Sequence, residues 1–306
     1  MLDLPRLRML IALREEGSIS AAARSLRYTA AAVSQQISKL EREVGLALVW
    51  RHPRGVTLTP SGDALADAGR DVMLRLAQAE SRATRLAGME TARLRIATFQ
   101  SASASLLPKI LSPLCERFPG LGLEFVQLPR DEALQMLRRH DADVALVHEH
   151  PELPGGIEQS GLVAEFLHAD FLRLVTAPSH AAAVWTEPVD LSRLDGEALI
   201  VGRAEDDDRQ VLDELFASMS VVPVHVAEVG EYFIAAAMAS SGIAITLMPH
   251  MAIPAGYPLV TKALAQTLER RVFLVTRDGD DSAAVSAFRE MAFAVMPAAR
   301  ALTSES

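Results

Sequence analysis

Residues 17–62 read GSISAAARSLRYTAAAVSQQISKLEREVGLALVWRHPRGVTLTPSG, and this stretch decides the fold of the N-terminal part of the chain. Ser18 and Thr29 each precede a run with helical spacing, where a hydroxyl caps a free backbone N–H. Gly45 follows the second run and ends it. The second helix has an apolar stripe made of Val33, Ile37, Leu40 and Val44. The stretch therefore predicts two helices joined by a tight turn.

Sequence on both sides of the two helices completes a small domain over residues 1–58. An upstream run with helical spacing predicts a further helix that ends at Gly17. Downstream, two β-prone runs at 48–51 and 56–58 flank His52-Pro53-Arg54-Gly55, and proline with glycine is typical of a hairpin turn. Three helices and a basic-tipped hairpin predict a winged helix-turn-helix, which inserts the start of its recognition helix into a major groove.

The net charge of −9 is distributed unevenly along the chain. The 39 acidic and 30 basic residues argue, as a total, against nucleic acid, because its binders usually have a positive face. Residues 1–58 carry nine basic and five acidic residues, or +4, whereas residues 91–306 carry −12 and residues 59–90 carry −1. This asymmetry favours nucleic-acid contact by the N-terminal part alone.

A long helix is predicted over residues 59–88. Thr59 and Pro60 supply a cap and a first-turn proline, Gly88 ends the helix, and residues 89–91 are interpreted as a hinge. Its apolar stripe at spacings of three, four or seven favours pairing with a second copy, although packing against the chain's own body is the alternative. The predicted dimerisation residues are Leu65, Val72, Leu76, Ala79 and Leu86.

From residue 92 the pattern changes to alternating strands and helices. This alternation predicts an α/β body over residues 92–302 with a mostly parallel sheet. The expected strands are 94–98, 121–126, 144–147, 171–176, 199–201, 224–227, 243–246 and 272–276. Sheets of this kind bind ligands at the carboxyl ends of strands, near helix starts.

Several functional classes lack support in the sequence. Cys115 is the single cysteine, which excludes an internal disulfide and a cysteine-built zinc site. No G-x-S-x-G, P-loop or H-E-x-x-H motif occurs, so we expect no enzyme and no cofactor. His148-Glu149-His150 offers two metal ligands where a site needs more, and residues 205–208 are interpreted as a solvated helix start, so no metal is expected. Without a signal peptide or a membrane span, we expect a cytoplasmic protein that does not contact the membrane.

The order of features in residues 17–62 resembles the DNA-binding part of LysR-type transcriptional regulators. These features are the GS helix start, AAxxL, S-x-Q-I-x-x-LE, VG, the arginine after the first wing strand and GVxLTxxG. Family landmarks are also similar in the body: LLPKIL (106–111), RFP (117–119), DVAL (143–146) and SSGIAITLMP (240–249). The resemblance spans nearly the whole chain and is most specific in its N-terminal part.

The resemblance implies the architecture of the body and its partners. The body would be a two-lobed, periplasmic-binding-protein-like domain, with lobe I at 92–162 and 266–302 and lobe II at 163–265. A small-molecule effector would bind between the lobes and alter how a homodimer or homotetramer holds double-stranded promoter DNA. Two alternatives remain: a ligand-independent DNA-binding repressor, and a solute-binding or small α/β enzyme domain with a head used for assembly.

The predicted DNA contacts cluster on the second of the two capped helices and on the hairpin. Arg51 and Arg54 are the expected phosphate contacts. Ala30-Ala31 stands where the family often has Gln-Pro, which removes a side chain able to bond adenine, and Trp50 is expected in the core rather than on DNA. The full set is Arg24, Thr29, Ala30, Ala31, Ser34, Gln35, Ser38, Lys39, Arg51 and Arg54.

The predicted effector contacts lie at strand ends and helix starts of the body. Serine hydroxyls and free backbone N–H groups after the first body strand suit a carboxylate, and ordinary capping by serine is the alternative. The set is Gln100, Ser101, Ser103, Arg130, His148, Gly202, Arg203 and Glu231. Together these features predict a transcriptional regulator whose promoter binding responds to a small, polar effector.

Overall fold

The computed structural model describes residues 3–52, 55–87, 92–154, 156–157 and 161–296. The chain divides into two compact units, Met1–Ala83 and Thr84–Ser306. The first unit holds the predicted DNA-binding part and most of the long helix, and the second holds the α/β body. In the described residues, no helix is long and apolar enough to cross a bilayer.

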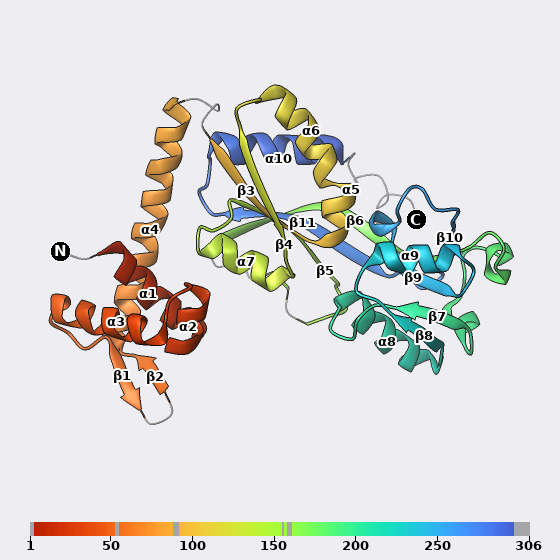
Figure 1. The fold of residues 1–306 in the computed structure, drawn as a ribbon, viewed down its shortest axis with the longest axis horizontal. Helices are drawn as coiled ribbons and strands as arrows, with labels where there is room; N and C mark the ends of the chain where they lie inside the picture. Colours follow the sequence, from red (N-terminus) through yellow and green to blue (C-terminus); the bar gives the residue numbers. More distant parts are fainter. Residues whose placement is uncertain (1–2, 53–54, 88–91, 155, 158–160, 297–306) are drawn as a thin grey trace, which may run out of the picture. The chain divides into compact units, whose positions relative to one another are not determined.

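The first unit contains the three helices and the hairpin that the sequence predicts (Figure 1). In order they are α1 (Leu4–Glu16), α2 (Ile19–Ser25), α3 (Ala30–Val44), β1 (Val49–His52) and β2 (Gly55–Leu58). One core holds them together, and the stripe of α3 supplies three of its fully buried side chains, Val33, Ile37 and Leu40. Burial of that stripe leaves the opposite face of α3 for solvent or a partner.

The predicted caps of the two helices are confirmed. Ser18 and Thr29 each accept a hydrogen bond from the backbone N–H three residues further on, at 3.2 Å. Gly17 and Gly45 end α1 and α3 with positive φ angles of 68° and 73°, a conformation that costs glycine little. These local signals fix where α3 begins, and therefore which residues stand at its N-terminal end.

Trp50 lies on the surface, contrary to the expectation that it belongs to the core. Its exposed fraction is 52%, whereas the preceding Val49 is buried. Alternate side chains of a strand point to opposite faces, so in the two-stranded β1–β2 hairpin the burial of Val49 turns Trp50 outward. The indole of Trp50 is therefore available to a partner of the hairpin.

The long helix α4 (Pro60–Ala87) begins tightly against the end of the α3–β1 connection. Thr59 caps it by accepting a bond from the N–H of Gly62 at 3.0 Å, and the Thr59 hydroxyl donates to the carbonyl of Ala47 at 2.8 Å. A Cβ placed on Gly62 would lie 2.1 Å from the carbonyl oxygen of Leu48. Only glycine allows this close approach of helix and backbone.

Replacing Gly62 by alanine is expected to destabilise the first unit by about 1–3 kcal/mol, because the new methyl group must displace the Leu48 backbone. Gly69→Ala is the matched control within the same helix. There the new Cβ meets only the ends of the Leu7 and Ile11 side chains, at 3.3 and 3.4 Å, and alanine is the better helix former. Thermal unfolding followed by circular dichroism measures both, and equal melting temperatures for the two variants would contradict this account.

The second unit is organised by one nine-stranded sheet with the order β4-β3-β5-β11-β6-β9-β7-β8, from which β10 pairs with β6. The strands are β3 (Arg93–Thr98), β4 (Gly122–Gln127), β5 (Val144–Glu149), β6 (Leu162–Thr176), β7 (Ala198–Val201), β8 (Val224–Glu228), β9 (Ile245–Pro249), β10 (Val260–Ala263) and β11 (Glu269–Arg277). The eight expected strands are all present, with shifted ends, and β10 is additional.

The sheet is mixed, which corrects the expectation of a mostly parallel one. β3 pairs in parallel with β4 and β5, and β7 with β8 and β9. The long strands β6 and β11 pair antiparallel with each other and with their other neighbours. An apolar run predicts a strand but carries no information on the direction of its partner, which is a property of the whole sheet.

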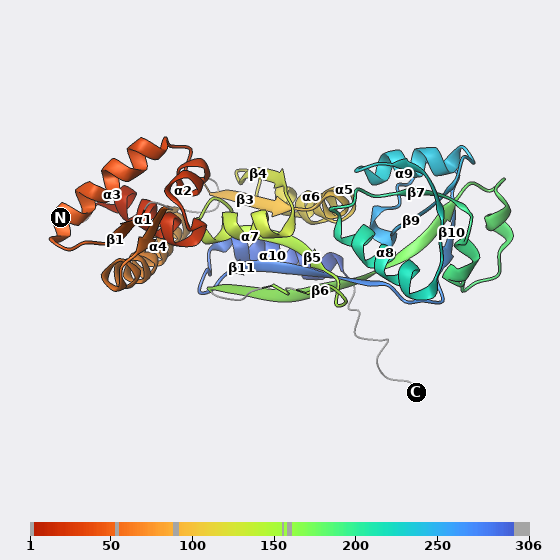
Figure 2. The ribbon, with the colours of Figure 1, turned by 90° about the horizontal axis from the view of Figure 1, so that it is seen from below.

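Helices cover the sheet, and separate apolar cores distinguish two lobes of the body. They are α5 (Gln100–Ser105), α6 (Leu107–Arg117), α7 (Arg130–Arg138), α8 (Asp207–Met219), α9 (Tyr232–Ser240) and α10 (Ala283–Val295), with 3₁₀ turns at η2 (Ala181–Val184), η3 (Leu191–Leu194) and η4 (His250–Ala252). Strand β6 begins at residue 162 rather than 171 and runs through both lobes (Figure 2). Its Leu167 belongs to the core of the first lobe and its Leu172 to the core of the second.

Candidate DNA interface and ligand cleft

The face of α3 opposite the core holds most of the predicted DNA contacts. Ala30, Ala31, Gln35 and Lys39 are exposed there. The hydroxyl-bearing Ser34 and Ser38 are half-buried on the same side of the helix. Small residues at the N-terminal end and polar ones further along give a surface that another macromolecule can approach closely.

Arg51 ties the hairpin to this face of α3. Its guanidinium donates to the hydroxyls of Ser34 at 3.3 Å and Ser38 at 2.8 Å, and lies 3.9 Å from the Glu41 carboxylate. Three predicted DNA contacts are thus one hydrogen-bonded group. The sequence did not predict this link, because it joins residues 13 and 17 positions apart through the fold of the hairpin.

The positive charge of the first unit is concentrated around α2, α3 and the hairpin. Arg14 pairs with Asp63 at 3.2 Å and also with Asp67, while Arg6 pairs with Glu43. These arginines are paired with carboxylates. The exposed basic residues near α3 are Arg24, Arg27, Lys39 and Arg51, of which Arg51 lies 3.9 Å from the Glu41 carboxylate. Arg54 at the hairpin tip lies outside the described residues.

Two exposed residues stand directly before α3: Arg27, which the sequence suggests as added charge near the DNA backbone, and Tyr28, which was not predicted. Arg27 adopts a positive φ of 57° in the turn, and Tyr28 is 54% exposed beside the helix start. Thr29, which was predicted to contact DNA, uses its hydroxyl for the cap. A cation and a phenol next to a helix N-terminus are the kinds of group that contact a phosphate backbone, and a basic-aromatic pair directly before a cap was the available signal.

The predicted dimerisation stripe of α4 divides between two environments. Leu65 packs against the core of the first unit. Val72, Leu76 and Ala79 are exposed, whereas the side chain of Leu86 lies outside the described part of the helix. An exposed apolar pair one turn apart is unusual on an isolated helix and is suited to a partner helix.

A cavity of about 530 Å³ opens between the two lobes of the body. All of the predicted effector contacts except Ser103 line it: Gln100, Ser101, Arg130, His148, Gly202, Arg203 and Glu231. The hydroxyl of Ser103 instead donates to the carbonyl of Phe99, inside α5, at 2.9 Å. Strand ends therefore located the cavity, because the carboxyl ends of β3, β5 and β7 meet there.

The floor of the cavity is a buried ionic network that the sequence did not reveal. Arg270 of β11 is 0% exposed and donates to Asp170 and to the hydroxyl of Ser101, each at 2.7 Å. It also lies 3.5 Å from the Asp208 carboxylate and 5.2 Å from the centre of the Phe99 ring. The two buried carboxylates compensate the buried guanidinium and raise the pKa of Arg270 against the effect of its burial.

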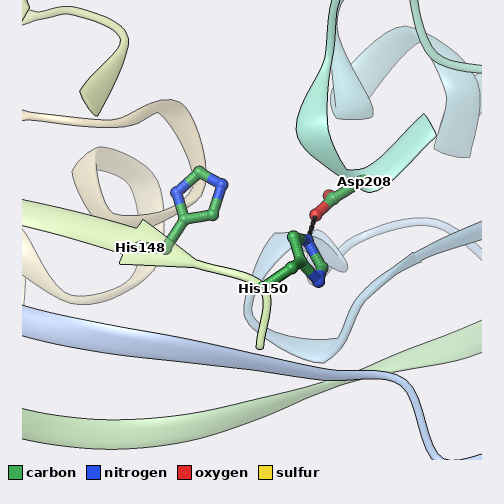
Figure 3. Close-up of side chains that lie close together, drawn as sticks. All are labelled: His148, His150 and Asp208. Carbon is green, nitrogen blue, oxygen red and sulfur yellow. Dashed lines mark hydrogen bonds and ion pairs between the residues drawn. The ribbon is translucent and has the colours of Figure 1, made fainter. Parts of the chain in front are cut away.

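Asp208 joins this network to a histidine of the other lobe (Figure 3). Its carboxylate lies 2.6 Å from His150 Nε2 and accepts a hydrogen bond from the Tyr232 hydroxyl. Burial would raise the pKa of Asp208, but the Arg270 charge and the His150 bond outweigh it and hold that pKa below its ordinary value. Asp208 is 8% exposed, which corrects the interpretation of residues 205–208 as a solvated helix start.

His148 is held in the neutral state beside this network. Its ring packs against Phe99 with the ring centres 4.6 Å apart. Burial, together with the charge of Arg270, lowers the pKa of His148 to about 3. The Nδ1 atoms of His148 and His150 are buried without a hydrogen-bond partner among the described residues, so the rings retain unused donor or acceptor capacity.

Charged groups at the mouth of the cavity come from both lobes. Gln100 of α5 donates to Glu231, which precedes α9, and so links the lobes across the opening. Arg130 lies 3.2 Å from Asp131, and Arg209 lies 2.7 Å from Asp213. Arg203 lies against Gly230, where a Cβ would come within 2.5 Å of its guanidinium.

Two family models together match nearly the entire chain. Residues 4–63 match the model described as a bacterial regulatory helix-turn-helix protein of the lysR family, and residues 87–297 match the LysR substrate binding domain. The chain belongs to the LysR family of transcriptional regulators. The resemblance seen in the sequence is thereby confirmed, together with the predicted fold class of a helix-turn-helix followed by a two-lobed α/β domain.

Known members of the LysR family are similar over the same extent. The regulator TfdS of Cupriavidus pinatubonensis is 29% identical over 88% of both chains. A variant of full-length OxyR from Pseudomonas aeruginosa superimposes with a TM-score of 0.63 at 19% identity, covering 96% of this chain and 98% of that one. Full-length CbnR in complex with its target DNA gives a TM-score of 0.54 at 19% identity, covering 97% and 100%.

This LysR-type regulator is a DNA-binding protein whose activity in transcription is modulated by a small-molecule effector. Its relatives are regulators rather than enzymes, which removes the alternative of an enzyme domain with an assembly head. Regulators of the family bind promoter DNA and act as oligomers.

Proposed function

We propose that this regulator reads its operator through the outer face of α3 and the hairpin, and senses a small polar effector in the cavity between the lobes. The observation that carries the proposal is the cavity itself, because residues of both lobes line its 530 Å³. A ligand that bridges two lobes binds their closed arrangement best and shifts the population toward it. The predicted division into 1–58, 59–88, 89–91 and 92–302 fits this scheme and stays a prediction.

The DNA-contacting set remains the predicted one, with Arg27 and Tyr28 added. Arg51 has a double role in the proposal. Its charge faces the phosphates, and its bonds to Ser34 and Ser38 hold the hairpin at a fixed position beside α3. Arg24, Lys39 and Arg54 supply further phosphate contacts, and Gln35 reaches the base edges.

Removing the basic tip of the hairpin is expected to weaken binding to every DNA sequence. Arg54→Ala eliminates one proposed phosphate contact, so the slope of log affinity against log salt concentration is expected to fall by about 1. Fluorescence anisotropy of a labelled duplex at graded salt measures the slope. Arg117→Ala, in the exposed pair of the body with Glu290, is the matched control. An unchanged slope in Arg54→Ala removes Arg54 from the contacts.

The proposed effector is a small molecule with a carboxylate group. Arg270 is already matched by two carboxylates, so the effector's anionic group is assigned to Arg203 and Arg130 at the mouth, one from each lobe. The hydroxyl of Ser101 accepts from Arg270, and His148 presents a neutral ring to the polar remainder of the ligand.

A thermal-shift screen with small carboxylic acids tests the effector proposal. A ligand that binds the folded state raises the melting temperature of the full chain in proportion to RT ln(1 + [L]/Kd). Arg203→Ala should abolish the shift caused by a hit, and Arg193→Ala, whose guanidinium stacks 4.4 Å over Trp185, should leave it intact. A hit whose shift survives Arg203→Ala overturns the assignment of the carboxylate.

The assembly is proposed as a homodimer or homotetramer in the cytoplasm, built on α4. Val72 and Leu76 form the exposed apolar pair that a second α4 would cover. The alternative, in which α4 packs against its own body, predicts a monomer by light scattering.

A further inference from the structure

We propose that the cleft also holds one divalent transition-metal ion, bound by His148, His150 and Asp208. The inference deepens the proposed function, since the three residues lie at the floor of the same cavity. It departs from the expectation of no metal, because Asp208 offers the third ligand that the His148-Glu149-His150 segment lacks.

The geometry brings three ligand atoms together from two lobes. His148 lies in β5 and His150 directly after it, while Asp208 stands in the first turn of α8 (Figure 3). One ligand atom from each lies within 4.8 Å of the other two. A metal ion holds nitrogen and oxygen ligands at about 2.0–2.2 Å, so the three ligand atoms would have to draw closer together to share one ion.

Both imidazole rings of the cluster have a buried nitrogen that the described fold leaves unused. His150 is 2% exposed, and its Nδ1 has no hydrogen-bond partner in the described part of the chain. The Nδ1 of His148 is also buried and also has no hydrogen-bond partner among the described residues. A buried polar atom without a partner costs free energy, so these rings have nitrogen capacity that the described fold does not use. The His150 nitrogen that faces Asp208 is Nε2, at 2.6 Å, so an ion bound by both residues would replace this hydrogen bond and release the shared proton.

The net charge around the three proposed ligands is compatible with a dication, even though the Arg270 guanidinium lies nearby. Asp170 and Asp208 together carry one negative charge more than the Arg270 guanidinium that they enclose. Asp206 and Asp207, which line the cavity beside Asp208, add further negative potential. A dication reverses the net charge of the floor and so adds to the attraction of the cavity for the anionic effector proposed above.

The donor set selects the class of metal. Two imidazoles and one carboxylate suit zinc, nickel, cobalt or copper, whereas magnesium and calcium prefer oxygen ligands alone. Three protein ligands leave further positions open, as in sites that bind an exogenous ligand.

Titration of the EDTA-treated full chain with Co²⁺ tests the inference. Visible absorption of the bound cobalt reports its ligands, and one ion per protomer is expected, with Zn²⁺ displacing it. His148→Gln and His150→Gln should each weaken Co²⁺ binding by at least about 10-fold. His225→Gln, on the exposed strand β8, is the matched control and should bind as the unaltered chain does.

Every outcome is decisive. If the unaltered chain binds no Co²⁺ in excess metal, or if both histidine variants bind it like the control, the site is overturned. Circular dichroism checks that each variant is folded. If His150→Gln does not fold, the result for His148→Gln is used alone, because His148 lines the cavity. DNA binding by anisotropy is measured on the same samples. If the unaltered chain binds DNA but no Co²⁺, the metal site alone is refuted. If the unaltered chain does not bind DNA, the proposed function is refuted.

Discussion

Replacing Arg270 by methionine is expected to lower the free energy of unfolding of the body by about 3–5 kcal/mol. The variant leaves the carboxylates of Asp170 and Asp208 buried, with side chains 1% and 11% exposed, without the guanidinium that lies beside both. A buried charge that has lost its partner costs more free energy than the intact pair contributed, because no water replaces the lost partner.

Urea unfolding measures this effect in a Trp50→Phe background, where Trp185 of the body is the remaining tryptophan. Arg117→Met is the control, because its exposed pair with Glu290 contributes only about 0–1 kcal/mol. Adding Asp170→Asn and Asp208→Asn to Arg270→Met should restore part of the loss, since the charges are then removed together. A loss as small as that of Arg117→Met would show that the network is not what stabilises the floor.

Replacing Ile37 by alanine is expected to destabilise the first unit by about 2–5 kcal/mol and to abolish tight DNA binding. Ile37 is fully buried at the centre of the α3 stripe, in a small core built from α1, α2, α3, the hairpin and the start of α4. Such a small core has little stability in reserve, so the loss of one large side chain unfolds a substantial fraction of the population.

Ile37→Val is the graded control, because it removes a single methylene and is expected to cost about 0.5–1.5 kcal/mol. Anisotropy with a labelled duplex measures DNA binding, and fluorescence of Trp50 in a Trp185→Phe background follows the unfolding of the first unit. Equal DNA affinities for Ile37→Ala and the unaltered chain would mean that α3 does not depend on this core for its position.

The first unit was predictable almost in full from local sequence. Capping by Ser18 and Thr29, the endings at Gly17 and Gly45 and the stripe of α3 are all interactions within a few residues of the chain. The wrong prediction that Trp50 lies in the core arises from packing between elements rather than from local sequence. Which side of β1 faces the core depends on packing against the helices, and a two-stranded hairpin leaves its other side uncovered.

The cavity was predictable in position but not in chemistry. Residues such as Gln100 and Arg203 follow strands, and the carboxyl ends of neighbouring strands meet in space, so strand ends were sufficient to locate it. Arg270 and Asp170 lie within strands β11 and β6, where the sequence pattern indicates only a polar residue in a buried run. Their partners are 100 or more residues away along the chain.

The sequence by itself determined a basic DNA-reading unit joined to an acidic α/β body, because helix caps, apolar periodicity and charge act over short separations. Only the tertiary structure decided the direction of β6 and β11, the bond of Arg51 to α3 and the meeting of Asp208 with two histidines. Each of these depends on how strands pair and elements pack, which brings distant residues to contact distance, and side-chain interactions of a few ångströms are set by that arrangement.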